Sequence, residues 1–216
     1  MDLEVQAPVR TNGAVTGRGA ATRARILEAA GAELVETGDL EVTAVAARAG
    51  VSAGLPYRYF GTRSGLLVAV VDDFYERLGR AAVYRRYDEE TWAGRERRRI
   101  ADWVAFLYAD PLSPVIIGGL VGDGEVAAAN ATRLREAIAV GARNVARAQE
   151  DGQLPTGRDP GLLVAAMLGG THSAVAEALG RRPRPAADDV AAELWRCVAG
   201  AAGIDADQQP LPGGQS

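Results

Sequence analysis

The chain has 216 residues, of which 48% are hydrophobic, so it can bury the core of one ordinary domain or of a small domain joined to a larger one. Its formal net charge of −4 excludes a protein that binds nucleic acid through bulk positive charge, but leaves room for a basic patch on one face. One cysteine and one histidine exclude a disulfide framework and the usual multi-ligand zinc sites, so we predict no metal and no cofactor.

The two ends of the chain are polar and rich in small residues. Residues 1–20 contain Pro8 and three glycines but lack the apolar run of a signal peptide, and we expect a flexible arm. Residues 204–216 are expected to form a disordered tail. Because no stretch of 18 apolar residues occurs, the sequence predicts no transmembrane helix. The single cysteine and the missing export signal together predict a cytoplasmic protein.

Between these ends, apolar residues recur at helical spacing, and no period-two run lasts more than a few residues. The sequence therefore predicts an all-α fold of about nine helices and no strand. The expected helices cover, approximately, residues 22–37, 42–49, 52–60, 63–82, 94–108, 114–121, 125–150, 159–179 and 186–202.

The segment from Val42 to Leu66 has the pattern of a helix-turn-helix, the motif whose second helix enters the DNA major groove. Gly50 can adopt the positive φ that a tight turn between helices needs, and Ser52 is a good N-cap for the second helix. The segment contains three arginines and no acidic residue, which predicts a local basic face.

Three motifs in this region stand in a fixed order: T-R-x-R-I-L-E-A-A at 22–30, V-A-A-R-A-G-V-S at 45–52 and G-L-P-Y-R-Y-F-G-T-R-S-G-L-L at 54–67. Through them, residues 22–78 resemble the N-terminal domain of the tetracycline-repressor (TetR) family of transcriptional regulators. The resemblance implies an N-terminal three-helix DNA-binding domain at 21–66, followed by a C-terminal helical effector-binding and dimerisation domain at 67–203.

The resemblance also implies which residues contact DNA. Tyr57 and Thr43 match phosphate contacts, and Arg63 opens a helix whose N-terminus favours an anion. Arg58 is the candidate for a bidentate contact to guanine. The full expected set is Arg23, Thr43, Ser52, Ala53, Gly54, Leu55, Tyr57, Arg58, Tyr59, Thr62 and Arg63.

Two features depart from the family pattern. Pro56 lacks the N–H that would make the first intrahelical bond if Ser52 were the N-cap. We therefore expect the helix either to begin later or to start with a 3₁₀ turn. The linker Gly38 to Glu41 is short, and the helix after it lacks the common Ser or Thr cap. We expect Phe60 to be a core residue and Arg48 to be a solvated surface charge.

In the C-terminal half, the resemblance implies an effector pocket, for which the candidates are Trp103, Phe106, Leu107, Met167 and Thr171. It also implies a homodimer formed by the helices at 159–179 and 186–202, whose small residues permit close approach of helices. The expected partners are therefore a double-stranded DNA operator, a second copy of the chain and an unknown small-molecule effector, with no membrane.

We therefore expect the protein to regulate transcription by binding a specific DNA sequence. The default is a repressor that a small-molecule ligand releases from a palindromic operator. Two alternatives from other classes stay open. One is an all-helical enzyme that uses Cys197 and His172 as nucleophile and base. The other is a helical ligand-binding protein without a DNA function.

Overall fold

The computed structural model describes residues 17–118 and 124–206. In these ranges it contains nine α-helices, one π-helix and no strand, which confirms the predicted fold class. The elements are α1 (Gly17–Thr37), α2 (Val42–Arg48), α3 (Leu55–Phe60), α4 (Arg63–Leu78), the π-helix η1 (Gly79–Val83), α5 (Trp92–Ala109), α6 (Ser113–Ile117), α7 (Gly124–Glu150), α8 (Pro160–Gly180) and α9 (Ala187–Ala202).

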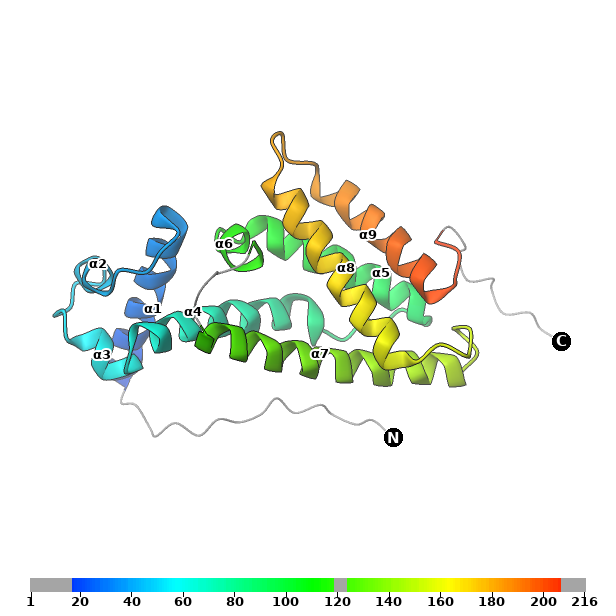
Figure 1. Ribbon diagram of the computed structural model, residues 1–216, viewed down its shortest axis with the longest axis horizontal. Helices are drawn as coiled ribbons and strands as arrows, with labels where there is room; N and C mark the ends of the chain where they lie inside the picture. Colours follow the sequence, from blue (N-terminus) through cyan, green and yellow to red (C-terminus); the bar gives the residue numbers. More distant parts are fainter. Residues whose placement is uncertain (1–16, 119–123, 207–216) are drawn as a thin grey trace.

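The helices form an elongated molecule with α1, α2 and α3 at one end (Figure 1). Helix α4 leads from this end into the rest of the molecule and packs against α7. Helix α8 packs against α7, and α9 packs against both α8 and α5. The N-terminal helices and the α8–α9 pair thus lie in different parts of the structure.

Two apolar clusters form the core. The first joins the N-terminal helices to the body, since Ile26, Val45 and Phe74 share it with Leu107 and Val175, all five fully buried. The second cluster lies under α9 and includes Trp195 and Val104. The predicted boundary between residues 66 and 67 falls within α4, so one continuous helix and one shared core connect the two predicted domains.

The expectations for the two chain ends need correction. Helix α1 begins at Gly17, so residues 17–20 are helical rather than part of a flexible arm; alanines at 20 and 21 favour this extension, and residues 1–16 lie outside the described residues. At the other end, the indole Nε1 of Trp195 donates a hydrogen bond to the Ala206 carbonyl at 3.1 Å. Ile204 and Ala206 also pack against the second cluster, so the chain is still held to the core there, and residues 207–216 lie outside the described part.

The turn between α2 and α3 resolves the question raised by Pro56. Gly50 has a φ of +65°, as predicted. Helix α3 begins at Leu55 with Gly54 as its N-cap, so the prediction that Ser52 caps it is wrong and the later start is correct. Pro56 then lies in the first helical turn, where its missing N–H costs nothing, and the Leu55 N–H donates to the Ser52 carbonyl at 2.9 Å in a tight turn.

A glycine at position 50 should be required for stability. Alanine at this positive φ costs about 1–2 kcal/mol, so Gly50→Ala should lower the melting temperature by roughly 2–8 °C for a chain of this size. Gly180 has a negative φ and open space around its missing Cβ, so Gly180→Ala is the matched control and should cause no loss. Circular dichroism at rising temperature measures both; equal melting temperatures would contradict the assigned turn.

Candidate nucleic-acid interface

Helix α3 has one face packed on the protein and one face open to solvent. Pro56 is buried, and Leu55, Tyr59 and Phe60 pack against the first core cluster, which agrees with the core role expected for Phe60. Since residues three and four apart share a helix face, this packing leaves Tyr57 and Arg58 outside. Tyr57 is 47% exposed, Arg58 is exposed as well, and α3 lies at the end of the molecule away from α8 and α9 (Figure 1).

Arg58 differs in its surroundings from the other two arginines of the motif. Arg48 and Arg63 each bind carboxylates of the same chain. Within residues 17–118 and 124–206, no ion pair involves Arg58. Its five N–H donors are therefore available to a ligand outside the protein, in the fork geometry that suits guanine or phosphate.

The remaining residues expected to contact DNA surround α3. Ser52, Ala53 and Gly54 are exposed in the turn before the helix, whereas Leu55 is half-buried against the core. Arg23 of α1 is exposed, with its guanidinium 5.0 Å from the centre of the Phe60 ring. A cation–π contact of this kind fixes the arginine beside the end of α3.

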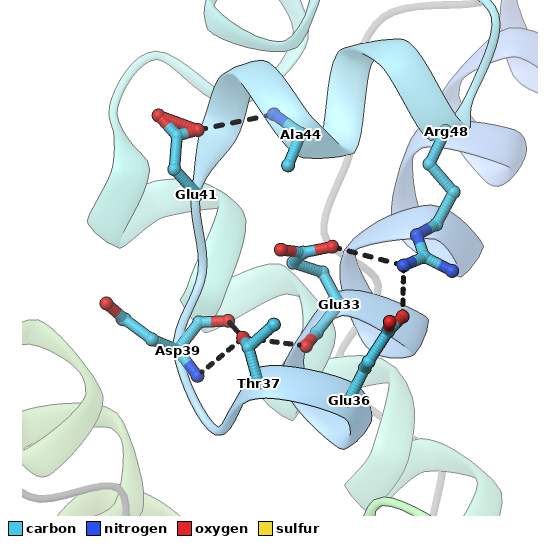
Figure 2. Close-up of polar contacts among 7 residues, drawn as sticks. All are labelled: Glu33, Glu36, Thr37, Asp39, Glu41, Ala44 and Arg48. Carbon is cyan, nitrogen blue, oxygen red and sulfur yellow. Dashed lines mark hydrogen bonds and ion pairs between the residues drawn. The ribbon is translucent and has the colours of Figure 1, made fainter.

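The N-terminus of α2 is capped by a residue that sequence reasoning missed. Glu41 Oε2 accepts hydrogen bonds from the Thr43 backbone N–H at 2.7 Å, from the Thr43 hydroxyl at 2.7 Å and from the Ala44 N–H at 3.2 Å (Figure 2). These bonds, with that of the Thr43 hydroxyl first, lower the pKa of Glu41. The hydroxyl and amide of Thr43 expected to reach a phosphate thus already hold a carboxylate. A negative side chain is favourable beside a helix N-terminus, so Glu41 directly before α2 was a signal present in the sequence.

The start of α4 is tied to the same linker. Thr62 caps α4 by accepting the Gly65 N–H at 2.8 Å. Arg63 turns toward the linker, where its Nε donates to the Leu40 carbonyl at 2.9 Å and its Nη2 pairs with Asp39. A hydrogen bond from the Leu40 N–H, followed by the bond from Arg63, lowers the pKa of Asp39, so this carboxylate is ionised at neutral pH.

Arg48 is more than the solvated charge that the sequence predicts. Its Nη2 donates to Glu33 Oε2 at 3.3 Å and also pairs with Glu36, and both glutamates lie on α1 (Figure 2). Glu33 is only 7% exposed, so Arg48 supplies the partner that a nearly buried carboxylate needs. These two ion pairs hold α2 against α1 and thereby fix the position of the turn that leads to α3.

The five predicted pocket residues lie within the packed body. Leu107 is fully buried, Trp103 contacts both core clusters and the Phe106 ring packs 5.6 Å from that of Phe74. Met167 packs on the second cluster, and its carbonyl accepts a hydrogen bond from the Thr171 hydroxyl at 2.7 Å. None of the five lines the cavity of about 690 Å³ that lies between α1, α4 and residues 110–112.

The two residues of the enzyme alternative lie on different helices. His172 of α8 makes a hydrogen bond with the backbone of Ile117, while burial of the ring lowers its pKa. Cys197 is exposed on α9. Among the described residues no hydrogen bond joins the two, so the geometry offers no support for a nucleophile–base pair.

Helix α8 is long and apolar enough to cross a membrane by length and composition, yet only 28% of its apolar window is buried within the chain. Leu162 on this helix is 75% exposed. Along α8 and α9 lie further exposed small residues: Ala166, Gly169, Gly170, Ser173, Ala174, Ala192 and Gly200. The α8–α9 pair thus carries apolar and small residues that the single chain leaves exposed.

Comparison with known proteins locates the family signal. The description "Bacterial regulatory proteins, tetR family" matches residues 26–70. No curated protein matches the chain. Three of the solved structures that share its fold illustrate the likeness. The fatty acid degradation regulator FadR from Bacillus halodurans is 18% identical, with 83% of this chain and 95% of that chain covered and a TM-score of 0.72. SmeT, the repressor of the Stenotrophomonas maltophilia multidrug efflux pump SmeDEF, is 21% identical, with 88% and 97% of the two chains covered and a TM-score of 0.70. A TetR-like transcriptional regulator from Rhodococcus sp. RHA1 is 20% identical, with 85% and 97% covered and a TM-score of 0.65.

The match at residues 26–70 covers α2, α3 and most of α1, and it ends inside α4. The solved structures extend the likeness to the fold of most of the chain. Residues 26–70 therefore match the TetR family model, and most of the chain has the fold of these solved regulators.

Proposed function

We propose that this protein is a sequence-specific, DNA-binding transcriptional regulator, a repressor that a small-molecule ligand releases from a palindromic operator. The observation that carries the proposal is the outer face of α3, which holds Tyr57 and Arg58 at one end of the molecule, clear of the body. A short helix after a glycine turn, with an available guanidinium on its solvent side, fits the major groove.

The proposed DNA contacts divide into two kinds. Arg58 reads a base edge, whereas Tyr57, Thr43 and the start of α4 at Thr62 and Arg63 hold the phosphate backbone. Arg23, Tyr59 and residues 52–55 lie beside this set and complete the face. Of the motif's three arginines, only Arg58 is uncommitted within the described chain, so the protein relies on few phosphate contacts in each subunit.

We propose further that α8 and α9 of two chains form a four-helix bundle. The exposed small residues of the α8–α9 surface support this arrangement, because they let helices of a second copy approach closely. A twofold axis there places two α3 helices on one side of the dimer, which suits successive major grooves roughly 34–36 Å apart. We assign residues 21–66 to DNA binding and 67–203 to effector binding and dimerisation, in a cytoplasmic protein.

Release by a ligand needs a connection between the two parts, and α4 supplies one. It begins at the proposed DNA face with Arg63 and places Phe74 in the core beside Phe106. A ligand held near Trp103, Phe106, Leu107, Met167 and Thr171 would move α4 and so change the spacing of the two α3 helices. DNA affinity then falls by the ligand's differential affinity for the two states, commonly about 1–3 kcal/mol. That SmeT is a repressor supports repression as the default.

Tyr57→Phe should weaken binding to every DNA sequence by a similar factor. The hydroxyl of this exposed tyrosine would donate to a phosphate, and a typical hydrogen bond to a charged group contributes about 1.5–3 kcal/mol. Fluorescence anisotropy on the operator and on a scrambled duplex measures both affinities. A change confined to the operator would instead place Tyr57 at a base edge.

The proposal is tested by footprinting the purified protein on DNA upstream of its own gene. The expected result is a protected segment with twofold symmetry, lost when a cognate ligand is added. The result that would overturn it is salt-sensitive coating of the whole fragment with no protected segment.

A further inference from the structure

The linker Gly38–Glu41 places two carboxylates on the groups that the proposed function assigns to DNA phosphates. Glu41 Oε2 holds the amide and hydroxyl of Thr43, each at 2.7 Å, and Asp39 pairs with Arg63. Both acidic side chains come from one stretch of four residues, and each occupies a different phosphate contact. Figure 2 shows Asp39 and Glu41 along the linker that enters α2.

The fold explains why both acids point outward at this place. Gly38 ends α1 with a φ of +76°, and Leu40, only 1% exposed, anchors the linker in the core. Because successive side chains of an extended segment point in opposite directions, burying Leu40 turns its two neighbours to the surface. The Asp39 side chain is 78% exposed, and its Oδ1 accepts hydrogen bonds from the Leu40 N–H and from Arg63 Nη2.

A carboxylate and a phosphate oxygen make the same demand on these donors, since both are anionic acceptors of charge-assisted hydrogen bonds. A DNA phosphate that takes the Thr43 amide must displace the Glu41 carboxylate, which remains tethered nearby. A phosphate that binds the Arg63 guanidinium shares it with the Asp39 carboxylate. Like charges at such a separation repel, so each phosphate contact becomes weaker than its donor alone would make it.

From this we propose that Asp39 and Glu41 are internal competitors for the DNA backbone, which lower the sequence-independent affinity and leave discrimination to the base contacts of α3. The inference rests on the proposed function, because it takes Thr43 and Arg63 as phosphate contacts. Its structural rival is that Glu41 only caps α2 and that Asp39 only holds Arg63 in a useful position.

Substitutions that keep the hydrogen bonds and remove the charge separate the two accounts. Glu41→Thr retains a capping oxygen, Glu41→Gln retains the length of the side chain, and Asp39→Asn retains an acceptor for Leu40 and Arg63. Glu28→Gln is the charge-matched control, since Glu28 is exposed on α1 and lines the groove against α4 and residues 110–112. Thermal unfolding of each variant shows that it is folded.

The measurement is fluorescence anisotropy of the full-length protein on a labelled duplex of scrambled sequence, as a function of KCl concentration. One added phosphate contact changes the salt slope by about 0.9, which is roughly an eightfold difference between about 0.1 M and 1 M salt. Glu41→Thr, Glu41→Gln and Asp39→Asn should therefore each bind several-fold tighter than the wild type at about 0.1 M salt, with a steeper salt slope. Glu28→Gln should bind as the wild type does.

The outcomes distinguish this inference from the proposed function. Tighter binding by the linker variants, including the case in which only they bind, supports internal competition. If the wild type binds DNA and all three variants bind equally well or more weakly, internal competition is overturned and the carboxylates have a structural role. If neither the wild type nor the double variant with Asp39→Asn and Glu41→Gln binds DNA at low salt, the proposed function itself is wrong.

Discussion

Arg58→Ala should reduce affinity for the operator by about 1–3 kcal/mol in each half-site and remove much of the preference for operator over scrambled DNA. The reason lies in the surroundings of this side chain: it is exposed on α3, and no carboxylate within the described residues engages it. A bidentate contact to guanine is lost with the guanidinium, and alanine leaves the short helix intact because it has the highest helix propensity.

The effect is measured by anisotropy on the operator and on a scrambled duplex at one fixed salt concentration. Arg97→Ala is the control, since Arg97 is an exposed arginine of α5, away from α3, and its loss changes the net charge by the same amount. We expect the control to bind like the wild type. If Arg58→Ala left both affinities unchanged, the side of α3 placed against the bases would be wrong.

Gly170→Arg should convert the proposed dimer to a monomer and lower operator affinity by about 10²–10⁴, since two linked half-site contacts become independent. Gly170 is exposed in the middle of α8, and no atom lies within 4 Å of the position that a Cβ would take. Arginine therefore fits the isolated chain and improves its helix propensity by about 0.8–1 kcal/mol. The same side chain would force a charge into a close helix–helix contact.

Sedimentation velocity gives the oligomeric state, and thermal unfolding shows that the protomer remains folded. Ala105→Arg on the exposed side of α5 is the matched control and should remain a dimer. A Gly170→Arg protein that is still dimeric and binds DNA normally would exclude the α8–α9 surface as the interface.

The sequence predicted those parts of the site that local chemistry determines. Gly50 marks the turn because only a residue without Cβ takes a φ of +65° easily. The start of α3 was left open: Pro56 has no N–H to donate and pointed to a later start, but the cap predicted at Ser52 was wrong. The apolar spacing of α4, with Leu66, Val70 and Phe74 buried, predicted the helix that joins the two parts.

The contacts that adjust the proposed DNA face could not be predicted in this way. The pairing of Arg63 with Asp39 joins residues 24 positions apart, and that of Arg48 with Glu33 joins residues 15 apart. Both pairs depend on how α1, α2 and α4 pack, which no local pattern records. The residues of an effector pocket cannot be predicted from the sequence either, because the pattern around Trp103 and Met167 is the same whether they line a cavity or fill a core.

The account depends on two α3 helices presenting Arg58 to one side of a dimer, and selection of binding sites from random duplex DNA tests this most directly. The account predicts enrichment of a palindrome whose half-sites are about 10–10.5 base pairs apart, or a multiple of this, and each half-site should contain a guanine that Arg58→Ala no longer selects. Enrichment of an unsymmetrical single site, or of no sequence at all, would contradict it.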